Sequence, residues 1–124
     1  MIFEEVFMAD NRQKGKENEE RAVIFLENLG FKILEKNYHC SFGEIDIIAK
    51  ENKYLVFVEV KYRKNLNYGT PHEAIDLRKQ RRIYQVAKFY MYSKGYSEEF
   101  PCRFDSVLIL NDKIELIRHS FGGI

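Results

Sequence analysis

Residues 43–61 read GEIDIIAKENKYLVFVEVK, an apolar stretch with acidic residues near both ends. Residues 54–62 give the strongest β-strand signal in the chain, because aromatic and β-branched residues follow one another there. Leu55 to Val58 are apolar at every position, so we expect this strand to lie in the centre of a sheet, covered on both faces. Residues 43–49 read as the preceding strand of a hairpin that turns at Asn52-Lys53.

The register of this hairpin brings acidic side chains together. Symmetric closure about the turn places Asp46 opposite Glu59 and Glu44 opposite Lys61. Directly opposed residues share a face of a sheet, and Glu59 and Lys61 share one because they are two positions apart. A shift of one residue would move these side chains to the other face, so the prediction depends on a turn of even length.

The flanking sequence predicts further helices and strands. A helix over residues 12–29 would end at Gly30, and a second helix would begin at the capping box Thr70-Pro71-His72-Glu73 and end at Gly95. Strands are expected over residues 31–38, 103–110 and 113–119, the last two as a hairpin. A right-handed crossover makes the strands on either side of the second helix parallel. The prediction is an α/β fold in which helices flank a mixed central sheet, in the order α-β-β-β-α-β-β.

Length and composition describe one domain. A chain of 124 residues with 45% apolar residues can build a single core. We expect residues 12–124 to form that domain and residues 1–11 to be a flexible N-terminal extension.

No apolar run approaches the roughly 20 residues of a membrane span, and the acidic start MIFEE is unlike a signal peptide, so we expect a cytoplasmic protein with no membrane partner. The two cysteines, Cys40 and Cys102, are too few for a zinc cage or a disulfide framework.

A third acidic residue is expected beside the hairpin pair. Glu19 falls on the apolar stripe of the first helix near Ala22 and Leu26, whereas Glu20 points away from it. Carboxylates about 4 Å apart repel by roughly 4 kcal/mol at an effective dielectric near 20, so such a cluster requires a cation or a proton. Lys61 can supply part of that charge, and a hard divalent ion such as Mg²⁺ (or Mn²⁺) can supply the rest.

The alternative is that the Val-Glu-Val-Lys segment is only the exposed ladder of a half-buried strand. The apolar residues just before Glu59 argue against it, because an unpaired charge at the end of a central strand costs several kcal/mol. We therefore expect Glu19, Asp46, Glu59 and Lys61 to form a site.

These segments resemble the YraN family of bacterial proteins over about residues 12–110. The resemblance rests on Gly43-Glu44-Ile45-Asp46 and Phe57-Val58-Glu59-Val60-Lys61, together with Gly15, Glu19, Ala22, Lys79, Arg82, Ala87 and Arg103-Phe104-Asp105. That family is similar to archaeal Holliday-junction resolvases and belongs to the restriction-endonuclease-like superfamily, known by the motif PD-(D/E)XK. In this chain Ile45 stands where the motif has proline, and Asn18 stands where a glycine commonly precedes the helix acid.

The resemblance implies a restriction-endonuclease-like fold and a role for each residue of the site. Asp46 and Glu59 would be metal ligands, Lys61 would orient or activate the attacking water, and Glu19 would complete the metal site. Mg²⁺ or Mn²⁺ would be the cofactor.

The middle of the chain is strongly basic. Residues 61–94 carry nine Lys or Arg and two Asp or Glu. A surface of this kind holds phosphates without reading base sequence, although a plain solvated helix face could have the same composition. The residues expected to contact nucleic acid are Arg63, Lys64, Arg78, Lys79 and Arg82.

The sequence thus predicts a metal-dependent endonuclease that hydrolyses phosphodiester bonds in DNA, with branched or junction DNA as one candidate substrate. One alternative is a nucleic-acid-binding module that keeps the nuclease fold and cuts nothing, and another is a structural or assembly protein. A domain of this size presents one site, so cutting two strands would be simplest for a homodimer.

Overall fold

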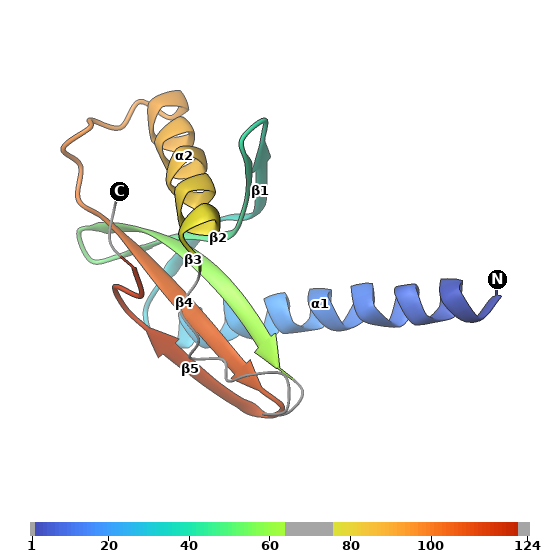
Figure 1. The fold of residues 1–124 in the computed structure, drawn as a ribbon. Helices are drawn as coiled ribbons and strands as arrows, with labels where there is room; N and C mark the ends of the chain where they lie inside the picture. Colours follow the sequence, from blue (N-terminus) through green and yellow to red (C-terminus); the bar gives the residue numbers. More distant parts are fainter. Residues whose placement is uncertain (1, 64–75, 122–124) are drawn as a thin grey trace.

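In the part of the chain that the structure describes, seven helices and strands follow one another in the predicted order. The fold is that of a computed structural model, which describes residues 2–63 and 76–121, with side chains from residue 15 onward (Figure 1). The elements are α1 (Ile2–Asn28), β1 (Lys32–Cys40), β2 (Gly43–Glu51), β3 (Tyr54–Arg63), α2 (Leu77–Ser93), β4 (Cys102–Leu110) and β5 (Lys113–Ile117).

The strands form one mixed sheet in the order β1-β2-β3-β4-β5. All neighbours are antiparallel except β3 and β4, which are parallel and connected through α2. The apolar strand β3 is central, and its residues Leu55 to Val58 are fully buried. The predicted central strand and the predicted parallel pair are therefore confirmed.

One helix covers each face of the sheet. Ala22 and Leu26 of α1 pack with Val56 and Val58, while Ile83 and Val86 of α2 belong to the cluster on the opposite face. Leu55 and Phe57 lie in that second cluster, so alternate residues of β3 serve the two cores. Figure 1 shows α2 and the C-terminal part of α1 on opposite sides of the sheet. This is the architecture expected of the restriction-endonuclease-like fold.

The first helix is longer than predicted. It begins at Ile2 rather than near residue 12, and its N-terminal half extends beyond the sheet (Figure 1). No glycine or proline occurs between residues 2 and 14, so nothing in the sequence interrupts the helix there. The division into an extension (1–11) and a domain (12–124) stays a prediction. The predicted C-terminal cap is confirmed, because Gly30 has φ +97° and the N–H of Phe31 donates to the carbonyl oxygen of Leu26 at 3.0 Å.

The second helix begins later than predicted. The capping box at residues 70–73 lies outside the described residues, and α2 starts at Leu77 with Asp76 as its N-cap. The Asp76 carboxylate accepts a hydrogen bond from the backbone N–H of Lys79 at 2.9 Å. Asp76 thus takes the role that we assigned to Thr70. The predicted end is confirmed, since Gly95 follows the helix with φ +80°.

A buried ion network ties β2 and β4 to the segment after β5. The Arg103 side chain, only 5% exposed, donates to both carboxylate oxygens of the fully buried Asp105 and to Glu51. Glu51 also accepts from Arg118, and the backbone N–H of His119 donates to Asp105. Every buried charge in the network therefore has a hydrogen-bonding partner, as burial requires.

Candidate active site

The hairpin register predicted from the turn is confirmed as far as the ladder runs. β2 and β3 pair from Glu51–Tyr54 to Ile47–Val58. The next facing residues in this register are Asp46 and Glu59, as expected, but the backbone ladder stops before them.

The carboxylate of Asp46 bonds to β3 at the point where the backbone ladder between β2 and β3 ends. Its Oδ2 accepts a hydrogen bond from the backbone N–H of Val60 at 2.8 Å. This N–H is thereby satisfied by a side chain instead of a strand neighbour. The bond holds the Asp46 carboxylate against β3, next in sequence to Glu59.

The backbone of β2 changes course at Asp46. Ile45 packs in the core on the α2 side and Ile47 in the core on the α1 side, although residues two apart in a regular strand share a face. On the neighbouring strand β1, Asn37 has φ +52° and no register partner, while Lys36 and Tyr38 pair normally. Asp46 therefore lies at an irregularity in both ladders, which the alternation of the sequence does not reveal.

The electrostatics of Asp46 show which groups surround it. Burial, which is the largest cause, and the negative charges of Glu59 and Glu19 together raise the pKa of its carboxyl from 3.8 to about 7. The Val60 N–H and the Lys79 ammonium act in the opposite direction. Glu19, Asp46 and Glu59 thus share one electrostatic environment. The predicted orientation of the helix acid is confirmed too, because Glu19 is half-buried and Glu20 is exposed.

A cation from α2 contacts Glu59. The Nζ atom of Lys79 lies 2.5 Å from Oε1 of Glu59, whose side chain is only 11% exposed. We assigned Lys79 to the nucleic-acid surface and expected Lys61 to balance the acids. The contact between Lys79 and Glu59 could not be predicted from the sequence, because it depends on where α2 begins and on how the first turn of α2 packs against β3. Lys61 is half-buried on β3, where alternation places it on the same face as Glu59.

The acidic residues suit a hard divalent ion. Among the described side chains, no three acidic, histidine or cysteine groups lie close enough to form a complete metal cluster. Mg²⁺ needs fewer protein ligands, because it is commonly held by one or two carboxylates, several waters and substrate phosphates. Asp46 and Glu59 provide such carboxylates. Burial and the charge of Glu59 both disfavour the ionised form of Asp46, and a bound cation would offset both effects. The donor set therefore fits Mg²⁺ or Mn²⁺, with Glu19 as a further acid nearby.

The residues predicted to contact nucleic acid are not all alike. Arg78 and Arg82 are exposed on α2. Lys79 is half-buried against Glu59, and Arg63 is half-buried at the end of β3, where its guanidinium donates to the carbonyl oxygen of Tyr62 at 2.9 Å. Lys64 lies outside the described residues.

Within residues 2–63 and 76–121, neither helix is long and apolar enough to cross a membrane.

Comparison with known proteins places the chain among bacterial relatives. The model of the uncharacterised protein family UPF0102 matches residues 18–109, which include Glu19, Asp46, Glu59 and Lys61. A UPF0102 protein of Lachnoclostridium phytofermentans is 48% identical over 92% of this chain and 97% of its own length. UPF0102 proteins of Clostridium botulinum and Fusobacterium nucleatum are each 42% identical, over 90% and 92% of this chain and 95% of their own lengths. The chain therefore belongs to the uncharacterised protein family UPF0102, which is the YraN family that its sequence resembles.

Proposed function

We propose that the protein is a metal-dependent endonuclease that hydrolyses phosphodiester bonds in DNA, with branched or junction DNA as one candidate substrate. The observation that carries the proposal is the acidic site at the end of the β2–β3 ladder. There the Asp46 carboxylate is held by the Val60 N–H, and burial together with the charges of Glu59 and Glu19 raises its pKa. Concentrating negative charge in this way costs stability, which is typical of a site built to bind a cation.

Each residue of the site has a proposed role. Asp46 and Glu59 would hold the ion, and Glu19 would complete the site from α1. A bound Mg²⁺ or Mn²⁺ would polarise the phosphate and lower the pKa of a coordinated water. Lys61 would position the attacking water on the same face of β3, and the exposed arginines Arg78 and Arg82 would bind the flanking phosphates.

One contact favours a second candidate function. Lys79 already neutralises Glu59, so one of the two carboxylates proposed to hold the metal has a cation beside it. A nucleic-acid-binding module that retains the nuclease fold and does not cut would tolerate this ion pair permanently. In an active enzyme, Lys79 would have to release Glu59 or share it when the metal binds.

Cleavage assays separate the two functions. Purified wild type and Glu59→Ala are incubated with junction, flap, linear duplex and single-stranded DNA in Mg²⁺ or Mn²⁺. We expect cutting by wild type alone. Binding of the same substrates without cutting by either protein, in both metals, would favour the non-catalytic module.

The proposed partners follow from the same chemistry. The nucleic acid would be DNA, encountered in the cytoplasm, and a homodimer would supply two sites for cutting two strands. Sedimentation of the free protein and of its complex with junction DNA measures the oligomeric state. A monomer in both states would contradict the proposed homodimer.

A further inference from the structure

The exposed face of α2 carries positive charge along its first turns. The segment Leu77–Ser93 holds five Lys or Arg residues and no Asp or Glu. Arg78, Arg81, Arg82 and Lys88 are all exposed, and at about 100° per residue they fall within about 120° of one another, on one side of the helix. We call this side the outer face of α2. It presents positive charge only, which suits a polyanion.

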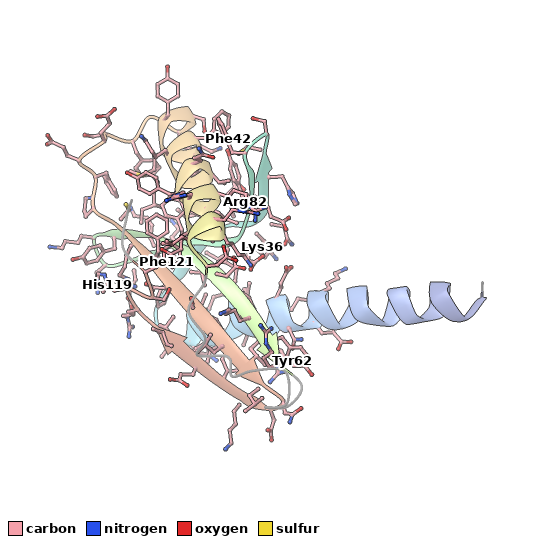
Figure 2. The ribbon with its side chains drawn as sticks, viewed as in Figure 1. Lys36, Phe42, Tyr62, Arg82, His119 and Phe121 are labelled. Atoms are coloured by element: carbon pink, nitrogen blue, oxygen red, sulfur yellow. The ribbon has the colours of Figure 1, made fainter. Side chains whose placement is uncertain are left out.

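The same face becomes aromatic toward its C-terminal end. Phe89 is 41% exposed and Tyr92 is 86% exposed, both in helical register with the basic residues. Phe42, from the turn between β1 and β2, is 47% exposed, and its ring centroid lies 6.1 Å from that of Phe89. Figure 2 shows Phe42 and Arg82 on the side of α2 that faces β1. A concentration of exposed rings at one place marks a binding surface.

A hollow adjoins these rings. Its volume is about 630 Å³, and its lining includes Phe42, Tyr84, Phe89, Tyr92, Tyr96 and Phe104. Lys88 lines it as well, with Nζ 5.6 Å from the centre of the Tyr84 ring, and Glu98 is the acidic residue of the lining. Aromatic walls beside cations are what proteins use to stack and hold unpaired bases.

We propose that the outer face of α2 binds a single-stranded segment of nucleic acid, with the phosphates on its arginines and unpaired bases stacked on Phe89, Tyr92 and Phe42. From Lys79 to Tyr92 the helix rises about 20 Å, the length of roughly six stacked nucleotides. Lys79, in the same turn as Arg78 but outside the outer face, contacts Glu59, so the basic end of the outer face lies in the helix turn that reaches the candidate active site. The inference rests on the proposed function for the identity of the partner, and it narrows that partner to DNA with an unpaired strand.

Binding measured without divalent metal tests the inference separately from cleavage. Labelled single-stranded and duplex DNA of equal length are titrated, in EDTA, with wild type and with the double variant Phe89→Ala/Tyr92→Ala. We expect the double variant to bind single-stranded DNA at least tenfold more weakly and duplex DNA within about threefold of wild type, since stacking matters only for unpaired bases. Tyr92→Trp should retain the wild-type affinity.

The matched control is Ile24→Ala/Leu29→Ala, which removes two other exposed apolar side chains, both from the α1 region. Unchanged single-strand affinity in the Phe89/Tyr92 variant would overturn the inference, as would an equal loss for single strand and duplex. A change of oligomeric state on sedimentation, with DNA affinity unaltered, would assign the rings to a protein interface instead. If wild type fails to cut any DNA but shows the expected binding differences, the proposed endonuclease falls and this inference stands.

Discussion

Lys79 Nζ lies 2.5 Å from Oε1 of Glu59, so the first turn of α2 contacts the acid that follows the apolar part of β3. This ion pair connects the basic helix to the candidate active site. It also means that a metal ion at Glu59 has to compete with an ammonium group. Lys79 is 45% exposed and Glu59 is 11% exposed, so the lysine is the partner with room to move away.

Lys79→Met should therefore strengthen metal binding. Removing one positive charge beside Glu59 lets Mg²⁺ or Mn²⁺ interact with both carboxylates, and we expect affinity to rise by about tenfold. Calorimetric titration of each protein with Mn²⁺, in the absence of DNA, measures this metal affinity. Lys88→Met, on the exposed side of the same helix, is the matched control. Equal affinities in Lys79→Met and wild type would show that Lys79 does not compete with the ion.

Asp46→Asn should stabilise the fold at alkaline pH. The pKa of Asp46 is raised from 3.8 to about 7, so its stabilising contribution is complete below pH 3.8 and is lost as pH rises through 7. An asparagine cannot ionise and keeps an oxygen for the Val60 N–H. We expect its melting temperature in EDTA to exceed that of wild type by several degrees at pH 8.5 and by much less at pH 5.

The control for this measurement is Glu20→Gln, which removes an exposed carboxylate from α1. It should leave the melting temperature nearly unchanged at both pH values. A constant difference between Asp46→Asn and wild type across this range would contradict the assignment, because the difference should grow as Asp46 ionises.

Glu51 should make the protein sensitive to acid. Its hydrogen bonds to Arg118 and Arg103 lower the pKa of Glu51 from 4.5 to about 2. A lowered pKa contributes stability above pH 4.5 that is lost as pH falls toward 2. The contribution is at most about 3 kcal/mol, and solvent around the half-exposed Arg118 reduces it. Glu51→Gln should thus be less stable than wild type at pH 6, and the gap should narrow toward pH 2.5 in urea unfolding experiments.

Glu98→Gln serves as the comparison for Glu51→Gln, because Glu98 is exposed. Its unfolding free energy should follow that of wild type at each pH. If the gap between wild type and Glu51→Gln stays constant from pH 6 to pH 2.5, the ion network does not set the acid sensitivity.

Glu19 and Glu20 should differ in their effect on cleavage. Glu19 faces the site and contributes to the raised pKa of Asp46, whereas its neighbour Glu20 is exposed. We expect Glu19→Gln to lower the cleavage rate by at least tenfold and Glu20→Gln to leave it unchanged. The cleavage rates of both variants and of wild type are measured under single-turnover conditions. Circular dichroism verifies that each variant is folded. Equal rates in the two variants would remove Glu19 from the proposed mechanism.

Much of the fold could be predicted from local patterns. The apolar run from Leu55 to Val58 indicated the central strand, and the glycines at 30 and 95 indicated the helix ends. The even turn at Asn52-Lys53 fixed the register that directs Asp46 toward Glu59. These features follow from the conformational preferences of neighbouring residues, which are legible in a sequence.

The helix starts were harder to predict, because several residues near each start can cap a helix. Asp76 and Thr70 both have capping side chains, and α2 uses Asp76. Starting α2 at Leu77 places Lys79 in its first turn, against Glu59. The contact between Lys79 and Glu59 could therefore not be predicted without the start of α2, whereas the assignment of Lys79 to the nucleic-acid surface stays a prediction.

The sequence sufficed for the order of the elements, the hairpin register and the side of α1 on which Glu19 lies, since each depends on neighbours along the chain. The contact of Lys79 with Glu59, the irregular backbone at Asp46 and the rings gathered at Phe42 and Phe89 depend instead on tertiary packing. They join residues from different elements, whose relative placement follows from how the two cores fill. Periodicity describes which face a residue occupies, whereas packing selects its partner on that face.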